Sequence, residues 1–241
     1  MSAAAPKRPI DLRSLGLLAA MLAVALALWD WLYPLKLFTV LLHELGHALA
    51  AVATGGSVDR IELSSGVGGA CWSRGGWDLV VLPAGYLGSM LLGGLILVGA
   101  SRTRHDRAIA AGIGVAILVV TAVWVRNLFG FVFSAIAGAA LIAMARYLSD
   151  RVNDLVLRFL GLVSCLYAVF DIKDDLISRT VPTSDASQMS RIIPLPPVVW
   201  GVVWIVVAIA AAGWLVLVAA RGPAPGEGGA PAAAAGRPRR A

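Results

Sequence analysis

The sequence is poor in charged residues. Only 14% of its 241 residues are Asp, Glu, Lys or Arg, whereas a soluble globular domain has about 25%. Apolar residues make up 59% of the chain, and the mean hydropathy is +0.83. One aqueous core cannot bury so much apolar surface. The composition therefore excludes an ordinary soluble domain and predicts an integral membrane protein.

Two further absences narrow the class of protein. The only cysteines are Cys71 and Cys165, and no CxxC pair is present, so we expect two free thiols rather than a disulfide framework. The net charge is +6, but the basic residues are scattered between apolar runs and along the C-terminal tail. Nucleic-acid binding needs a contiguous basic face, so we expect no nucleic-acid partner and a lipid bilayer instead.

Seven apolar stretches have nearly the length of about 20 residues that crosses a bilayer. They lie at about 15–33, 36–53, 79–100, 108–125, 128–146, 155–172 and 197–220. We expect residues 14–221 to form one integral membrane domain, an all-α polytopic fold of about seven transmembrane helices, whose first span is a retained anchor. Residues 1–13 and the Gly/Pro/Ala/Arg tail at 222–241 are expected to be disordered.

The orientation of these spans in the membrane does not follow from the sequence. The positive-inside rule places both the basic N-terminal segment and the basic C-terminal tail in the cytoplasm. Seven full spans cannot satisfy both ends. Either one end violates the rule or one span does not cross completely.

The connection from Gly55 to Asp78 differs from the other connections. Polar and apolar residues alternate from Val58 to Leu63, a glycine-rich turn follows, and a second short strand is expected around Ala70 to Ser73. We predict a small β-hairpin at the membrane surface, between the second and third spans. Its edge could pair with an extended substrate segment.

The second span contains the motif His43-Glu44-Leu45-Gly46-His47. On a helix, HExxH places both histidines on one face, one turn apart, so that both imidazoles can bind one zinc ion beside the glutamate. Zinc lowers the pKa of its bound water, and Glu44 then serves as general base and acid. Charged groups within an apolar span are costly and usually functional. We predict a zinc site with His43 and His47 as ligands and Glu44 as the catalytic residue.

Two histidines alone bind zinc poorly, so a third protein ligand is expected. His105 lies in a connection and is interpreted as a solvated loop residue. Asp171 and Asp175, which share a helix face at the end of the sixth span, are the candidates. We predict Asp171 as the third ligand with Asp175 as the alternative, and the spare carboxylate as the hydrogen-bond partner that orients a histidine. Asp185, further along, is interpreted as a helix N-cap.

These segments together resemble a known family. The HELGH helix, the hairpin after it, the run Ala84-Gly85-Tyr86-Leu87-Gly88-Ser89 and the run Asp171-Ile172-Lys173-Asp174-Asp175 are similar to the M50B-like branch of the site-2-protease-type intramembrane zinc metallopeptidases, peptidase family M50. The resemblance covers about residues 35–205. Two departures are the absence of the proline and asparagine of better-known members at Gly85–Ser89, and FDIKDD in place of their LDG.

The resemblance implies a hydrolase that cleaves peptide bonds of membrane-embedded proteins or peptides, in an integral multi-pass protein of the bacterial plasma membrane. It also implies that the second, third and sixth spans form the catalytic core. Gly85 and Ser89 are then candidate substrate-binding residues, and with Gly93 they form a ridge of small residues that permits close helix packing. The alternative is a membrane scaffold or adaptor that retains the metal site without cleaving. The oligomeric state is left open.

Overall fold

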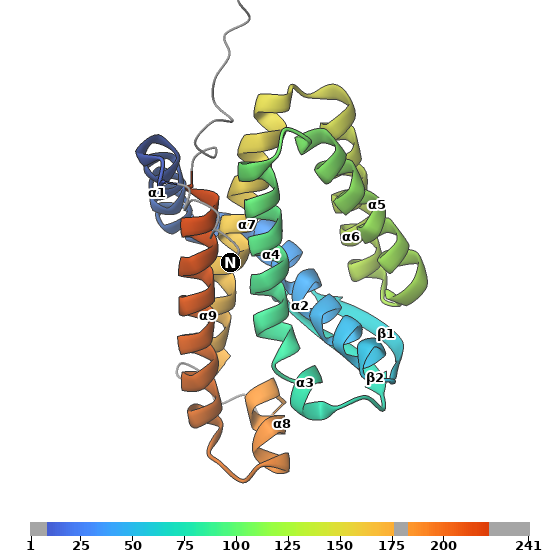
Figure 1. Ribbon diagram of the computed structural model, residues 1–241. Coiled ribbons are helices and arrows are strands. Elements are labelled where there is room, and N and C mark those ends of the chain that lie inside the picture. The colour runs from blue at the N-terminus through green and yellow to red at the C-terminus, as the bar shows by residue number, and fades with distance from the viewer. Residues whose placement is uncertain (1–8, 176–182, 222–241) are drawn as a thin grey trace, which may run out of the picture.

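The computed structural model describes residues 9–175 and 183–221 (Figure 1). The elements, in chain order, are α1 (Leu12–Ala27), the 3-10 helix η1 (Trp29–Trp31), α2 (Tyr33–Ala53), β1 (Ser57–Ser64), β2 (Gly68–Arg74), α3 (Asp78–Val81), α4 (Ala84–Arg102), α5 (Asp106–Trp124), α6 (Leu128–Tyr147), α7 (Asp150–Lys173), α8 (Asp185–Ile192) and α9 (Pro197–Ala219). The parts expected to be disordered at 1–8 and 222–241 lie outside the described residues.

Six of the expected spans are confirmed as helices long and apolar enough to cross a membrane: α2, α4, α5, α6, α7 and α9. The first expected span, 15–33, is divided. Its helical part, α1, has 16 residues and therefore a length of about 24 Å, less than the hydrocarbon core of about 30 Å. The chain then bends through η1, which carries Asp30, before α2 begins.

The helices form two groups (Figure 1). α4, α7 and α9 run side by side, while α5 and α6 form an antiparallel pair that leans away from them, and α2 crosses obliquely with the hairpin beside it. Glycines permit the closest crossings. A Cβ on Gly93 of α4 would lie 3.1 Å from the carbonyl oxygen of Gly161 on α7, and one on Gly46 of α2 would collide with the carbonyl of Ala84. Small residues thus let α4 pack against both α2 and α7.

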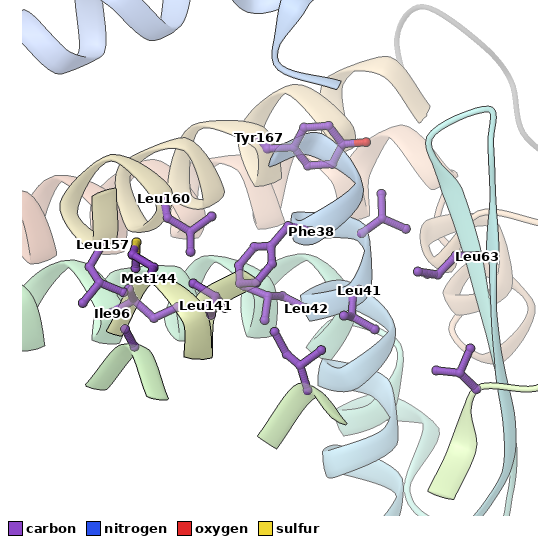
Figure 2. Packing of buried hydrophobic residues seen from close by; sticks show 14 of the residues in the cluster. Phe38, Leu41, Leu42, Leu63, Ile96, Leu141, Met144, Leu157, Leu160 and Tyr167 are labelled. Atoms are coloured by element: carbon purple, nitrogen blue, oxygen red, sulfur yellow. The ribbon is translucent and has the colours of Figure 1, made fainter. Parts of the chain in front are cut away.

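The main buried cluster lies where α2 meets α6, α7 and β1 (Figure 2). Phe38, Leu41 and Leu42 of α2 contribute to it, each at most 4% exposed. Inside a bilayer the association of such helices depends on van der Waals packing rather than on removal of water. This packing fixes α2, and with it the HExxH motif, relative to the other spans.

The predicted hairpin between the second and third spans is confirmed. β1 and β2 pair in antiparallel register from Ser57↔Arg74 to Ser64↔Gly68, with an irregularity between Val58 and Arg60. Its turn is anchored to the start of α2, because the Tyr33 hydroxyl donates to the carbonyl of Ser65 at 2.8 Å. The hairpin therefore lies along α2 over much of that helix.

Both described ends of the membrane domain meet at one end of the bundle. Ile10 forms a β-bridge with Arg221, and the Asp11 N–H donates to the carbonyl of Ala220 at 2.8 Å. The connection after α4 lies at the same end, since Arg102 donates to the carbonyl of Val218. We call this the terminal end, and we call the opposite end, with the hairpin, α3 and α8, the hairpin end.

Candidate metal centre

The two histidines of the HExxH motif face a common point. They lie one turn apart on α2, and their Nε2 atoms are 3.0 Å from each other. The rings meet edge to face, with centroids 4.8 Å apart. Both side chains are largely buried, at 12% and 9% exposure for His43 and His47. The helical spacing has therefore directed two ligand nitrogens to one place.

A third donor comes from α8. The Asp185 Oδ2 atom lies 3.2 Å from the Nε2 atom of His43 and 3.3 Å from that of His47. The interpretation of Asp185 as an N-cap is wrong: Ser184 caps α8, its hydroxyl accepting from the Ser187 N–H, and Asp185 is the first helical residue. The cap fixes the first turn of α8. In that turn the Asp185 carboxylate faces the histidines of α2.

The electrostatics of Asp185 match this arrangement. Burial by itself would raise the pKa of the carboxyl group, but the positive charge and hydrogen bonds of His47 and His43, when these are protonated, outweigh burial and hold that pKa well below its usual range. A metal cation held by the three donors would supply the same positive charge, which favours the carboxylate form that binds a metal.

The three donors fit a zinc ion. Zinc bonds of about 2.0 to 2.1 Å at tetrahedral angles place neighbouring ligand atoms about 3.3 Å apart, and here the separations are 3.0, 3.2 and 3.3 Å. Two imidazole nitrogens and one carboxylate oxygen are also a donor set of catalytic zinc sites. No other group of three such side chains comes as close together in the described part of the chain.

Gly85 keeps this space open. A Cβ at Gly85 would lie less than 3.0 Å from the Nε2 atoms of both histidines, which is closer than real Cβ contacts come. Any larger residue at the start of α4 would thus fill the region between the two nitrogens. Gly85, predicted as a substrate-binding residue, lies directly against the two histidine donors.

The other ring nitrogens, the two Nδ1 atoms, have different surroundings. The Nδ1 atom of His47 lies 2.7 Å from the carbonyl oxygen of Val81, a hydrogen bond that requires the proton on Nδ1. The Nδ1 atom of His43 lies 3.6 Å from Oδ2 of Asp171. The His43 contact is longer than a hydrogen bond, and Nδ1 of His43 has no hydrogen-bond partner among the described residues. The proton held on Nδ1 of His47 leaves the Nε2 lone pair of that residue free for a metal, which is the usual arrangement of a metal-binding histidine.

Asp171 and Asp175 are close to His43 but outside the three-donor group. The Oδ2 atom of Asp171 lies 3.6 Å from Nδ1 of His43, so the predicted hydrogen bond from a spare carboxylate to a histidine stays a prediction. Asp175 accepts a 2.8 Å hydrogen bond from the hydroxyl of Tyr86, whose ring packs edge to face on His43 with centroids 4.7 Å apart.

Ser89, the other predicted substrate-binding residue, is buried and donates to the Tyr86 carbonyl at 3.0 Å. It thus bonds within its own helix.

Glu44 lies next to the donors and against the hairpin. It is 5% exposed, and a Cβ on Gly69 of β2 would be 2.6 Å from its Oε1 atom. The backbone N–H of Cys71, two residues further along β2, also faces this carboxylate. The three donors, Glu44 and β2 line one cavity of about 850 Å³, with α8 and the end of α7 as its other walls.

Comparison with known proteins agrees with the geometry. The family model described as Peptidase M50B-like matches residues 16–215, which is most of the chain. A search of curated proteins and a search of solved structures each found no match. The matched range contains the HExxH helix, the hairpin, the glycine of α4 that faces the histidines, and α8. The chain is therefore a member of the Peptidase M50B-like family.

Proposed function

We propose that this integral membrane protein is a zinc-dependent endopeptidase of the bacterial plasma membrane, and that it cleaves peptide bonds of membrane proteins or membrane-embedded peptides. The observation that carries the proposal is the convergence of His43, His47 and Asp185 beside a buried glutamate in one cavity. Family membership supports a peptidase, and the donor set supports zinc as its metal.

His43, His47 and Asp185 would hold the ion. When bound, zinc acidifies a water molecule and polarises the carbonyl group of the scissile peptide bond. The Val81 carbonyl at Nδ1 of His47 keeps that imidazole in the orientation that binds metal through Nε2, and Asp171, 3.6 Å from Nδ1 of His43, is our candidate for orienting the other imidazole. The sequence had favoured Asp171 as a ligand, and we now assign that role to Asp185.

Glu44 moves the proton. Its carboxylate accepts a proton from the attacking water while the water oxygen bonds to the peptide carbonyl carbon. The C–N bond then breaks, and Glu44 returns the proton to the departing amine nitrogen. Because Glu44 is buried beside the donors and faces the N–H of Cys71, its position relative to the cavity is fixed before substrate arrives.

An extended substrate segment fits beside β2. Arg126 donates to the carbonyl of Ile61, and Asn127 bonds to the backbone of Leu63, so both residues of β1 turn their backbone groups away from β2. The backbone groups of their partners Cys71 and Gly69 then point to the opposite edge, where the N–H of Cys71 faces Glu44. In the described residues no strand pairs with that edge. A substrate strand bound there would lie alongside the catalytic glutamate.

The test compares Glu44→Gln with Glu62→Gln, the same change at a half-exposed hairpin residue that is ion-paired to Arg60. Each variant is co-expressed with a panel of single-span reporter proteins, and the zinc content of the purified protein is measured. We expect Glu44→Gln to retain about one zinc and to lose cleavage by at least about 100-fold, the contribution of a general base. Glu62→Gln should cleave like the wild type.

The same experiment decides between enzyme and scaffold. A scaffold predicts equal reporter processing in the wild type and Glu44→Gln, whereas the protease predicts that uncut reporter accumulates only in the Glu44 variant. Undiminished cleavage by Glu44→Gln would rule out the mechanism.

A further inference from the structure

The outer edge of β1 is closed by the short turn between α5 and α6. Val125 forms a parallel β-bridge with Ile61, and the N–H of Arg126 donates to the Ile61 carbonyl at 3.1 Å. The side chain of Asn127 completes the contact. Its Oδ1 accepts from the N–H of Leu63 at 3.0 Å, and its Nδ2 donates to the carbonyl of Leu63 at 2.7 Å. A carboxamide can make both bonds because it carries a donor and an acceptor side by side.

The surroundings of Asn127 are built for this contact. Gly130, on the first turn of α6, leaves room for it, since a Cβ there would lie 2.5 Å from the Asn127 Oδ1 atom and 3.2 Å from the Leu63 nitrogen. Leu63 and Val125 are each 2% exposed. The two hydrogen bonds are therefore shielded by close packing, where they are stronger than in water.

Leu63, the residue that Asn127 holds, lies directly across the hairpin from the part of β2 that faces Glu44. Leu63 is the ladder partner of Gly69, whose Cα faces Oε1 of Glu44. Likewise Ile61, held by the turn, is the partner of Cys71, whose N–H faces the same carboxylate. Paired strands are about 4.8 Å apart, so a shift of β1 moves β2 by the same amount.

We propose that Asn127 is a positioning residue of the protease site: by clamping Leu63, it sets the distance of the β2 edge from Glu44. The inference rests on the proposed function for its catalytic consequence. Asn127 touches neither the three donors nor the substrate edge, and it acts through the hairpin. Loss of the clamp should leave metal binding unchanged while it displaces the strand along which substrate is held.

The test uses Asn127→Leu, which keeps the size of the side chain and removes both hydrogen bonds, and Asn127→Asp, which keeps only the acceptor. The matched control is Asn153→Leu, because Asn153 is another buried amide that bonds to backbone carbonyls, between α6 and α7 at the terminal end. All variants are made with Cys165→Ala, so that Cys71 on β2 is the one remaining thiol.

Three quantities are measured: bound zinc, the rate of Cys71 alkylation by iodoacetamide, and kcat and KM for a reporter that the wild type cleaves. For Asn127→Leu we expect about one zinc, alkylation at least about tenfold faster because the hairpin opens more often, and kcat/KM at least about tenfold lower. Asn127→Asp should lie between Asn127→Leu and the wild type, and Asn153→Leu should match the wild type in alkylation.

Unchanged alkylation in Asn127→Leu would overturn the inference whatever the activity, and so would faster alkylation with unchanged kcat/KM. Equal acceleration in Asn153→Leu would also overturn it, since the effect would then be general destabilisation. If the wild type cleaves no reporter, the proposed function fails. The alkylation rates still decide whether Asn127 holds the hairpin.

Discussion

At the scale of single residues, the metal centre depends on carboxylates with different tasks. Asp185 contacts both Nε2 atoms, Asp171 faces only the Nδ1 atom of His43, and Asp175 is bonded to Tyr86. Three aspartates near one pair of histidines therefore have different expected effects on metal affinity.

Substitution of these aspartates by asparagine should separate the roles. We expect Asp185→Asn to weaken zinc binding by more than about 100-fold, Asp171→Asn by about 10- to 100-fold as for residues that orient a ligand, and Asp175→Asn by less than either. Competition with a chelator of known affinity measures the zinc dissociation constant of each variant. A larger loss in Asp171→Asn than in Asp185→Asn would return the third-ligand role to Asp171.

The glycine at the start of α4 allows a second test at this scale. Gly85→Ala would place a methyl group against both Nε2 atoms, so it should abolish zinc binding while the helix remains intact. Gly112→Ala on α5 is the control, because nothing lies within 4 Å of a Cβ there. Zinc content together with helical circular dichroism distinguishes loss of the site from loss of the fold. Full zinc occupancy in Gly85→Ala would contradict the geometry.

At the scale of elements, β2 is both a wall of the cavity and a support for Glu44. The thiol of Cys71 on β2 is sensitive to the surroundings of Glu44. Burial, followed by the nearby charges of Glu44 and Asp185, raises the pKa of this thiol from 9.0 to about 12. The thiolate is the nucleophile in alkylation. A raised pKa means less thiolate at every pH below 12, so Cys71 should react slowly at neutral pH.

The dependence of the alkylation rate on pH measures the pKa of Cys71. At pH 8, Cys71 of the Cys165→Ala protein should react with iodoacetamide about a thousandfold more slowly than an unperturbed thiol, given three pH units of difference. The rate should rise tenfold per pH unit up to the limit of protein stability. A half-maximal rate near pH 9 would show that the hairpin does not shield this thiol.

At the scale of the whole molecule, the arrangement of α1 and α2 settles how the ends are placed. α1 starts at the terminal end, and α2 leads into the hairpin at the opposite end, so α1, η1 and α2 together make one passage through the bundle. Five further spans follow, and Ile10 and Arg221 meet again at the terminal end. Both basic ends can therefore obey the positive-inside rule, which seven full spans would have prevented.

The described basic residues favour the cytoplasm for the terminal end. There they are Arg13, Arg102, Arg104, Arg107, Arg146, Arg151 and Arg221. In the sequence, the segments that adjoin Pro9 and Arg221 are also basic. The hairpin end carries fewer described basic residues: Arg60, Arg74 and Lys173, which are paired with acidic residues, and also Arg126 and Arg191. We predict that the cavity opens on the extracytoplasmic side.

Single cysteines in a protein without Cys71 and Cys165 test this orientation in intact cells. A membrane-impermeant maleimide should label Trp77→Cys, at an exposed position of the hairpin end. It should label Arg104→Cys, in the connection after α4, only after the cells are opened. The reverse pattern would place the cavity on the cytoplasmic side.

The sequence alone determined what depends on local pattern. The long apolar runs required a bilayer, the spacing of His43 and His47 required a shared helix face, and the alternation after Gly55 required a hairpin, because each follows from the geometry of a single segment. The tertiary structure decided what depends on segments far apart in the chain. Asp185 and Asn127 have no distinguishing local pattern, and the small-residue spacing of Gly85 indicated close helix packing rather than a place beside the histidines. Each acquires its role only through the approach of α8, α4 or the α5–α6 turn to α2 and its hairpin.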